Sequence, residues 1–399
     1  MPEVMTTTRV TGRDVGSGQG ISVTVADGRI AAIESTDLAL TSGSYLAAGL
    51  IDLQVNGFRG LDLNDSTVTP ARVAALTQMM TELGVTTYLP TLITASRASL
   101  LSNLAAIAEA RQQYPLCARM IPFVHVEGPY LAPEDGPRGA HPREHVRSPD
   151  LDEVAEWQRV SGGLVGKITL SPHHDQVPNF IRALVGQGIL VAIGHTSATA
   201  EQIHAAVSAG ARLSTHLGNG AAAILPRHPN FIWAQLACDR LDAGFIADGF
   251  HLPADTFKAM LRAKGLERAY LVSDTAALAG MPPGVYDQPI GGRVEVGSDG
   301  RLGVAGTPYL AGASRPLCED VALAIRMADL TLADGLQLAT INPGRFVGGR
   351  GRLAVGEAAD LILFDWEQGA ASLAIRETYV AGERFSAEVS CCDRQRGIP

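Results

Sequence analysis

Short apolar runs alternate with longer amphipathic stretches from about residue 50 to residue 345. The apolar runs include GVTTYLPTLI, ARMIPFVHVE, GKITLSP, GILVAIGHT, ARLSTHL, DAGFIADG and AYLVSDT. Between them lie stretches with helical periodicity, such as TPARVAALTQMMTELG, SRASLLSNLAAIAEARQQY, VPNFIRALVGQG, TAEQIHAAVSAG and PADTFKAMLRAKG. Strands that alternate with helices predict a parallel sheet, because each crossover needs room for a helix. Roughly seven or eight such units favour an α/β fold of the (β/α)8 TIM-type barrel class over an open doubly wound sheet.

The two ends of the chain have a different pattern. Near the N-terminus, ISVTVADGRIAAIE contains two alternating apolar runs around Asp27-Gly28, which indicates a hairpin. RLAVGEAADLILFD and TYVAGERF repeat this style near the C-terminus. Neither end has enough apolar surface to fold by itself, so we expect residues 1–49 and 347–399 to form one small β-sandwich domain. Residues 50–346 would then be a barrel domain inserted between them.

Composition and charge exclude several classes of protein. With 399 residues, of which 46% are hydrophobic, the chain can bury a core of barrel size. Its formal charge of -9 and the lack of any Lys/Arg block argue against nucleic acid or a membrane surface as a partner. The sequence therefore favours a small-molecule ligand held in a local pocket.

The same sequence predicts a cytoplasmic protein. No apolar run approaches the roughly 20 residues needed to cross a bilayer, and the first residues lack the basic and apolar parts of a signal peptide. The cysteines are odd in number and have no CxxC spacing, which argues against a disulfide framework and against a thiolate zinc site. They are Cys117, Cys238, Cys318, Cys391 and Cys392.

Polar side chains stand at the carboxyl ends of the predicted strands, which line one mouth of a barrel and carry the active site in this fold class. Counted from IDLQVNGFRG as the first of eight runs, they are Gln54 and Asn56 in that run, Glu127 at the end of the third, His195 of the fifth, His216 of the sixth, His251 after the seventh and Asp274 at the end of the eighth. Glu127, His195 and His216 form a three-ligand set that leaves one coordination position open. Such a set is typical of a catalytic divalent metal such as zinc.

Each of these residues also has a purely structural interpretation. An isolated histidine such as His195 or His216 is more often a core residue or the start of a turn than a ligand. Asp274 could cap the next helix, but a carboxylate facing the attacking water is also what a general base requires. Their joint occurrence at strand ends favours the metal site. His125, two residues before Glu127, is left out of the predicted set.

The motifs around these residues resemble the amidohydrolase superfamily and, within it, the N-acetylglucosamine-6-phosphate deacetylase family. The resemblance runs from AAGLIDLQVNG through HVEGPYL, GAHP, IGHTSAT, THLGN, IADGFH and VSDT to GEAADLILFD. Most superfamily members begin with a His-x-His metal pair, whereas this chain has Gln54 and Asn56 there, as the deacetylase branch does. The resemblance implies a vacated first metal site and one divalent ion on Glu127, His195 and His216. Zinc is the leading candidate, with iron, manganese or cobalt as alternatives.

By similarity, the reaction would remove the N-acetyl group of an amino sugar, with N-acetylglucosamine-6-phosphate as the leading substrate. Asp274 would activate the attacking water and then pass the proton to the departing amine, while His141 would contact the sugar and help to polarise the carbonyl. The resemblance implies further substrate contacts at Ala140, Asn219, Gly220, Arg227, His251, Leu310, Ala311 and Gly312. It also implies a homodimer, in which a loop of one subunit completes the phosphate pocket of the other.

The chain departs from the family pattern around the expected substrate. It has HLGNGAA in place of HLYNAM, ILPRHPNFIW in place of the REPG turn, and Tyr309 before the LAG segment. Arg227 could therefore be a phosphate clamp or a solvated loop charge. Phe231 and Trp233 could form an interface patch or close the helical layer of the barrel. Two alternatives stay open: a hydrolase of an unphosphorylated N-acetyl sugar or another N-acyl or cyclic amide compound, and a metal-binding protein without catalysis, against which Asp274 argues.

Overall fold

The computed structural model describes residues 7–288, 292–307 and 309–386. Eight parallel strands form its larger sheet, in the order β14-β13-β12-β11-β10-β9-β8-β5. They are β5 (Leu50–Val55), β8 (Val85–Ile93), β9 (Val124–Glu127), β10 (Val165–Leu170), β11 (Leu190–Ile193), β12 (Leu213–Ser214), β13 (Asp242–Phe245) and β14 (Ala269–Leu271). A parallel bridge between Val55 and Thr275 joins the two edges of this sheet. The predicted barrel is thereby confirmed.

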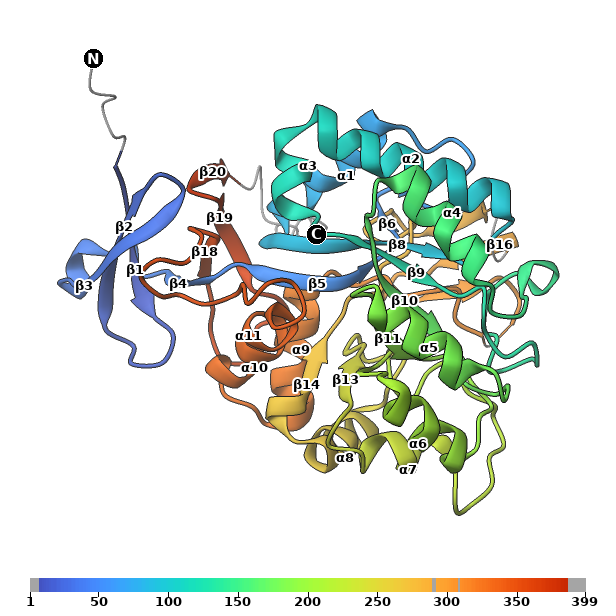
Figure 1. Ribbon diagram of the computed structural model, residues 1–399. Helices are drawn as coiled ribbons and strands as arrows, with labels where there is room; N and C mark the ends of the chain where they lie inside the picture. The colour runs from blue at the N-terminus through green and yellow to red at the C-terminus, as the bar shows by residue number, and fades with distance from the viewer. Residues whose placement is uncertain (1–6, 289–291, 308, 387–399) are drawn as a thin grey trace.

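Helices separate the strands and surround the barrel (Figure 1). The predicted helical stretches correspond to α1 (Pro70–Glu82), α2 (Arg97–Gln113), α5 (Val177–Gly186), α6 (Ala200–Ala209) and α8 (Ala254–Lys264). The others are α3 (Pro115–Met120), α4 (Leu151–Ser161), α7 (Phe231–Leu236), α9 (Leu317–Ala328), α10 (Leu332–Ala339) and α11 (Ile341–Gly344), with 3-10 turns at Leu38–Leu40, Arg143–His145 and Leu266–Arg268. Within the described ranges, no helix combines the length and the apolar character that a bilayer crossing requires.

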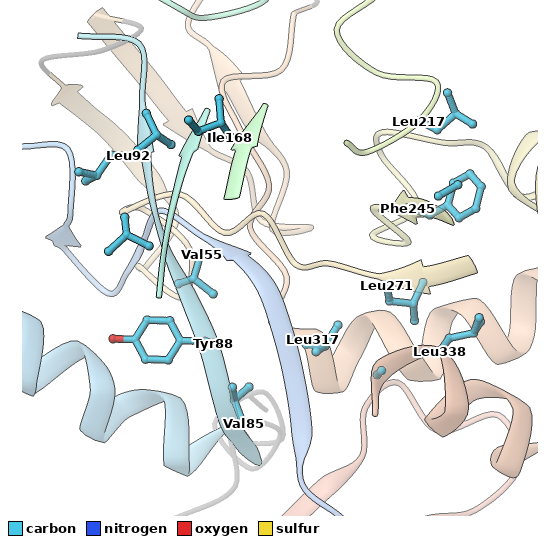
Figure 2. Close-up of a cluster of buried hydrophobic side chains, with 14 of the residues drawn as sticks. Val55, Val85, Tyr88, Leu92, Ile168, Leu217, Phe245, Leu271, Leu317 and Leu338 are labelled. Atoms are coloured by element: carbon cyan, nitrogen blue, oxygen red, sulfur yellow. The ribbon is translucent and has the colours of Figure 1, made fainter. Parts of the chain in front are cut away.

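Buried apolar side chains fill the space between strands and helices. Figure 2 labels Val55 of β5, Val85, Tyr88 and Leu92 of β8 and Ile168 of β10, all of them part of the same core cluster. The barrel strands are buried on both faces, which explains why they stand in the sequence as continuous apolar runs rather than as alternating ones. Polar residues at their carboxyl ends are consequently held on a rigid support.

The two ends of the chain build a second sheet of seven strands, seen beside the barrel in blue and red in Figure 1. Its order is β20-β19-β18-β4-β1-β2-β3. The strands are β1 (Thr8–Asp14), β2 (Gly20–Ala26), β3 (Arg29–Ser35), β4 (Tyr45–Ala48), β18 (Leu361–Asp365), β19 (Ala374–Val380) and β20 (Glu383–Ser386). The predicted shared, mostly antiparallel domain is confirmed. Its exact limits stay a prediction, because residues 1–6 and 387–399 lie outside the described residues.

One strand links the two halves of this small domain. β4 hydrogen-bonds to β1 on one side and to β18 on the other, so the two halves are joined in one continuous sheet. Side chains from both halves still share a core, which includes Val23 and Ile30 from the N-terminal strands and Leu361 and Tyr379 from the C-terminal strands. The physical reason is that β4 brings a pairing edge to each half.

Short strands that no sequence pattern predicted lie around the barrel mouth. β15 (Gly284–Gln288), β16 (Gly292–Val296) and β17 (Leu302–Val304) form an antiparallel sheet. Val294, Val296 and Leu302 of this sheet pack against Leu278. β6 (Gly57–Phe58) and β7 (Leu61–Asp62) form a hairpin directly after β5. These strands are too short to show a period in the sequence.

Candidate metal-dependent active site

Three predicted ligands converge at the carboxyl ends of β9, β11 and β12. Glu127 Oε1 lies 3.3 Å from His195 Nε2 and 3.0 Å from His216 Nε2, and the two Nε2 atoms are 3.2 Å apart. All three side chains are buried. The donor atoms of a tetrahedral zinc ion, bonded at about 2.0–2.1 Å, are about 3.3 Å from one another. The triangle of Glu127, His195 and His216 therefore has the size of one face of such a site.

The hydrogen bond of His195 leaves its Nε2 free to act as a ligand. His195 Nδ1 lies 2.8 Å from the carbonyl oxygen of Pro137, an atom that can only accept. Nδ1 must carry the proton in the neutral ring, so Nε2 presents its lone pair to the site. Gly139 and Gly220 allow the chain to pack closely on this ring: a Cβ on Gly220 would lie 2.7 Å from Nδ1.

Backbone strain is concentrated at the site. Seven non-glycine residues within the described ranges have a positive φ, and three of them are His195 (47°), His216 (26°) and Asp274 (50°). Side chains other than glycine rarely adopt this region, and it persists only where the surrounding structure imposes it. All three residues follow strands of the barrel, whose rigid ends can hold such conformations. The strain turns their side chains into the barrel mouth.

His141 lies beside the triangle of ligands but has the opposite tautomer. Its Nε2 is 3.3 Å from His195 Nε2 and 4.0 Å from Glu127 Oε2, so by distance alone it could also belong to a metal-binding group. However, the backbone N–H of Thr94 donates to His141 Nδ1 at 3.4 Å, and Thr94 Oγ1 lies 2.9 Å away. Burial lowers the pKa of His141 to about 3, so the ring is neutral and Nε2 carries the proton. His141 is therefore placed as a hydrogen-bond donor.

Asp274 faces the same space from the seam of the barrel. Its backbone N–H donates to the carbonyl of Gln54 at 3.0 Å, and its Oδ1 accepts from Asn56 Nδ2 at 2.7 Å. Burial, followed by the nearby charge of Glu127, raises the pKa of Asp274 above that of an ordinary aspartate. A raised pKa suits a carboxylate that must take a proton and later release it.

Glu127 has a contrasting electrostatic environment. Burial acts to raise its pKa, but the adjacent imidazole groups of His195 and His216 outweigh burial and hold the pKa well below that of an ordinary glutamate. Its second oxygen, Oε2, accepts a hydrogen bond from Gln54 Nε2 at 3.1 Å. Glu127 is therefore ionised, as a metal ligand must be.

A pocket of about 400 Å³ lies at these groups. Most of the predicted residues line it: Asn56, Glu127, Ala140, His141, His195, His216, Asn219, Gly220, His251, Asp274, Leu310, Ala311 and Gly312. His251 is held by Asp248, whose Oδ2 lies 2.7 Å from His251 Nδ1. Tyr309, noted for departing from the family pattern, also lines the pocket.

Sequence reasoning missed part of the pocket wall. The missed residues are Asp62, Asn64, Ile93, Gly139, Ile246, Ala276, Ala277, Leu278, Gln288, Val294 and Leu302. Several of them belong to the β6–β7 hairpin, to the segment after Asp274 and to the β15–β17 sheet. These segments carry no period in the sequence, although Asp62 and Asn64 do follow the first predicted strand closely enough to have been included.

Two predicted site residues lie outside the pocket. Gln54 is fully buried, and Arg227 is exposed in the loop before α7. No Arg or Lys is among the lining residues in the part of the chain that the structure describes. Of the two aromatic residues considered for an interface, Phe231 is buried within the helical layer, whereas Trp233 is 54% exposed. His125, which was left out, is buried between Thr91 and Thr169, deeper in the barrel.

The chain is similar to known proteins over most of its length. The model of the amidohydrolase family matches residues 45–385. A Bos taurus protein named N-acetylglucosamine-6-phosphate deacetylase is 33% identical over 361 residues, which cover 86% of this chain and 83% of the relative. A Shewanella sp. (strain ANA-3) protein named N-acetylgalactosamine-6-phosphate deacetylase is 33% identical over 375 residues, 91% of each chain. The crystal structure of N-acetyl-D-glucosamine-6-phosphate deacetylase from Mycobacterium smegmatis matches with a TM-score of 0.84 and 28% identity, covering 94% of this chain and 99% of that one. The chain therefore belongs to the amidohydrolase family of hydrolytic enzymes.

Proposed function

We propose that this protein is a metal-dependent deacetylase that hydrolyses the N-acetyl group of an amino sugar. The leading substrate is N-acetylglucosamine-6-phosphate, and the products are glucosamine-6-phosphate and acetate. The observation that carries the proposal is the triangle of Glu127, His195 and His216 with Asp274 and His141 beside it in one pocket. The names of the relatives support the substrate class, since those proteins are deacetylases of N-acetylated amino-sugar phosphates.

One divalent metal ion would be held by Glu127, His195 and His216. The amidohydrolase family is metal-dependent, and a donor set of one carboxylate and two imidazoles suits zinc first, and also iron, manganese or cobalt. When bound, the ion would lower the pKa of a water and polarise the amide carbonyl. The first metal position of the superfamily would be vacant, because Gln54 and Asn56 use their amide nitrogens on the two carboxylates.

Asp274 and His141 would carry out the proton transfer and the stabilisation of the carbonyl oxygen. Asp274 takes a proton from the attacking water while the oxygen of that water bonds to the carbonyl carbon. His141 donates from Nε2 to the carbonyl oxygen, where negative charge develops. Asp274 returns the proton to the nitrogen as the C–N bond breaks, so that acetate and a free amine leave the pocket.

Amine release from four substrates tests the reaction. We expect the zinc-loaded protein to act on N-acetylglucosamine-6-phosphate and N-acetylgalactosamine-6-phosphate in preference to the two unphosphorylated sugars. Removal of the metal with a chelator should abolish turnover, and zinc should restore it. If none of the four substrates releases an amine, the proposed function is wrong.

A second candidate is the hydrolysis of an unphosphorylated N-acetyl sugar. It is favoured by the absence of Arg and Lys from the described pocket lining and by the exposure of Arg227. The Arg227→Ala variant decides between the two candidates. If Arg227 binds the phosphate, the variant should lose the preference for the 6-phosphate. If Arg227 is a solvated loop residue, the kinetics should not change.

We also propose a homodimer and a cytoplasmic location. Ile224 is 90% exposed and Trp233 is 54% exposed on either side of Arg227, so a partner could cover these apolar side chains and receive the guanidinium. Sedimentation of the Trp233→Ser variant beside the wild-type protein tests the dimer. Cys117 and Cys238 form no disulfide within the described ranges, as is typical of proteins of reducing compartments.

A further inference from the structure

Two amide side chains each donate one hydrogen bond to a different carboxylate of the site. Gln54 Nε2 lies 3.1 Å from Glu127 Oε2, and Asn56 Nδ2 lies 2.7 Å from Asp274 Oδ1. The amide oxygens, Gln54 Oε1 and Asn56 Oδ1, are buried and have no hydrogen-bond partner among the described residues. The hydrogen bonds that these two side chains make within the described ranges are therefore the ones to the carboxylates.

The closure of the barrel fixes this pairing. Val55, which lies between the two amides, bridges Thr275, which follows Asp274. The backbone N–H of Asn56 donates to the carbonyl of Thr275 at 3.0 Å, and the N–H of Asp274 donates to the carbonyl of Gln54 at 3.0 Å. Both amides point into the barrel, since each of them hydrogen-bonds to a carboxylate of the site. The seam therefore sets the distance from each amide to its carboxylate.

Among the described residues, no other side chain donates a hydrogen bond to Glu127 Oε2 or to Asp274 Oδ1. Glu127 Oε1 is occupied by His195 and His216, while Oε2 accepts from Gln54. Within the described ranges, the hydrogen bond from Asn56 is the side-chain bond that Asp274 accepts. A neutral amide orients a carboxylate without cancelling its charge, whereas Lys or Arg would reduce both its basicity and its affinity for a metal.

We propose that Gln54 and Asn56 are positioning residues with separate tasks: Gln54 orients Glu127 for metal binding, and Asn56 orients Asp274 for proton transfer. The part that concerns Asn56 rests on the proposed function, whereas the part that concerns Gln54 requires only metal binding.

Zinc affinity tests the task of Gln54. Metal-free wild-type protein, Gln54→Met and Asn56→Leu are titrated with Zn²⁺ against a chromophoric chelator. Loss of a hydrogen bond to a metal ligand lowers affinity by about 10- to 100-fold, and we expect this loss for Gln54→Met. Asn56→Leu should bind zinc as the wild type does. Wild-type affinity in Gln54→Met, or an equal loss in both variants, would overturn the separation of tasks.

Steady-state kinetics of the zinc-saturated proteins test the task of Asn56. Asn56→Leu should lower kcat by about 100-fold, the cost of a misplaced catalytic group, and leave KM close to the wild-type value. Asn56→Asp has the same shape but sets a like charge against Asp274, so its kcat should be lower still at pH 7 and recover partly at lower pH. A purely structural role would not produce this order or this pH response.

Folding is checked by thermal unfolding of each variant. If Asn56→Leu does not fold, the isosteric Asn56→Asp carries the kinetic test. Wild-type kcat in either Asn56 variant would refute the role of Asn56. If the wild-type protein itself turned over no substrate, the proposed function would fail, and the zinc titration of Gln54→Met would still decide the inference for Glu127.

Discussion

At the scale of single residues, hydrogen-bond partners determine which histidine can bind a metal. His195 donates from Nδ1 to the Pro137 carbonyl, so its Nε2 is a lone-pair donor. His141 accepts at Nδ1 from the backbone N–H of Thr94, so its Nε2 carries a proton. The two Nε2 atoms are only 3.3 Å apart, yet they offer opposite chemistry.

Substitutions at the site should separate metal binding from proton transfer. Glu127→Gln, His195→Asn and His216→Asn should each lower metal content and activity together. Asp274→Asn should keep the metal and lower kcat by about 10²- to 10⁴-fold, the usual contribution of general acid–base catalysis. Metal content is measured by elemental analysis and activity by amine release.

His141 provides the control for this assignment. As a hydrogen-bond donor it should be dispensable for metal binding, so His141→Asn should retain the wild-type metal content and lose activity. Loss of metal to the same extent as in His195→Asn would make His141 a ligand instead.

At the scale of elements, an ion pair between the half-buried Arg147 and the buried Glu153 anchors the segment that carries His141. The segment between β9 and α4 is held by Arg147, whose Nε lies 2.9 Å and whose Nη2 lies 2.5 Å from the carboxylate of Glu153 in α4. Arg147 also donates to the carbonyl of Ala95 at 2.9 Å. Glu153 is 1% exposed and accepts from Tyr130 as well. The position of His141 in the pocket therefore depends on contacts made by α4.

Arg147→Met should destabilise the protein and slow the reaction. It leaves the Glu153 carboxylate buried and unpaired, which costs about 3 kcal/mol, and frees the segment that carries His141, so kcat should fall. Chemical denaturation measures the first effect and amine release the second.

The matched control is Arg97→Met, which removes the exposed ion pairs of Arg97 in α2 with Asp150 and Glu156 and should change stability little. Replacing both partners of the Arg147–Glu153 pair, as in Arg147→Met with Glu153→Leu, should restore stability but not the contact with Ala95. Equal stability of Arg147→Met and Arg97→Met would contradict the anchoring role.

At the scale of the whole molecule, a buried acid lies where α9 packs on the barrel. Asp320 is fully buried, and neither carboxylate oxygen has a hydrogen-bond partner among the described residues. Burial, and then the carboxylates of Asp248 and Asp52, raise the pKa of Asp320 well above that of an ordinary aspartate. Burial also raises the pKa of Asp52 to about 7. The barrel therefore carries a stability cost that grows with pH.

Asp320→Asn should remove the contribution of Asp320 to this cost. A carboxyl group whose pKa is higher in the folded than in the unfolded state contributes most stability at low pH. The contribution is lost as pH rises from the unfolded pKa towards the folded one, by about 1.4 kcal/mol per pH unit. The advantage of Asp320→Asn over the wild type should therefore increase between pH 5 and pH 8.

Melting temperatures across this range measure the effect. Asp175→Asn, at an exposed position, should follow the wild-type curve. If the curves of Asp320→Asn and the wild type are parallel, Asp320 does not titrate in this range.

The sequence by itself determined the strands and most of the helices of the barrel, and which polar residues meet at its mouth. Hydrophobic periodicity is a local property, so the eight barrel strands and the five predicted helices could be read directly from it. Glu127, His195 and His216 could be found because residues at the carboxyl ends of barrel strands must meet at one mouth.

Only the tertiary structure decided how these residues are used. The hydrogen bond of Asn56 to Asp274 joins positions 218 residues apart, and it exists because the barrel closes between them. The tautomers of His141 and His195 depend on backbone groups of loops that the sequence does not bring together. The β15–β17 wall of the pocket, the continuous small sheet and the exposure of Arg227 arise in the same way, since long-range packing decides which groups of a chain become neighbours.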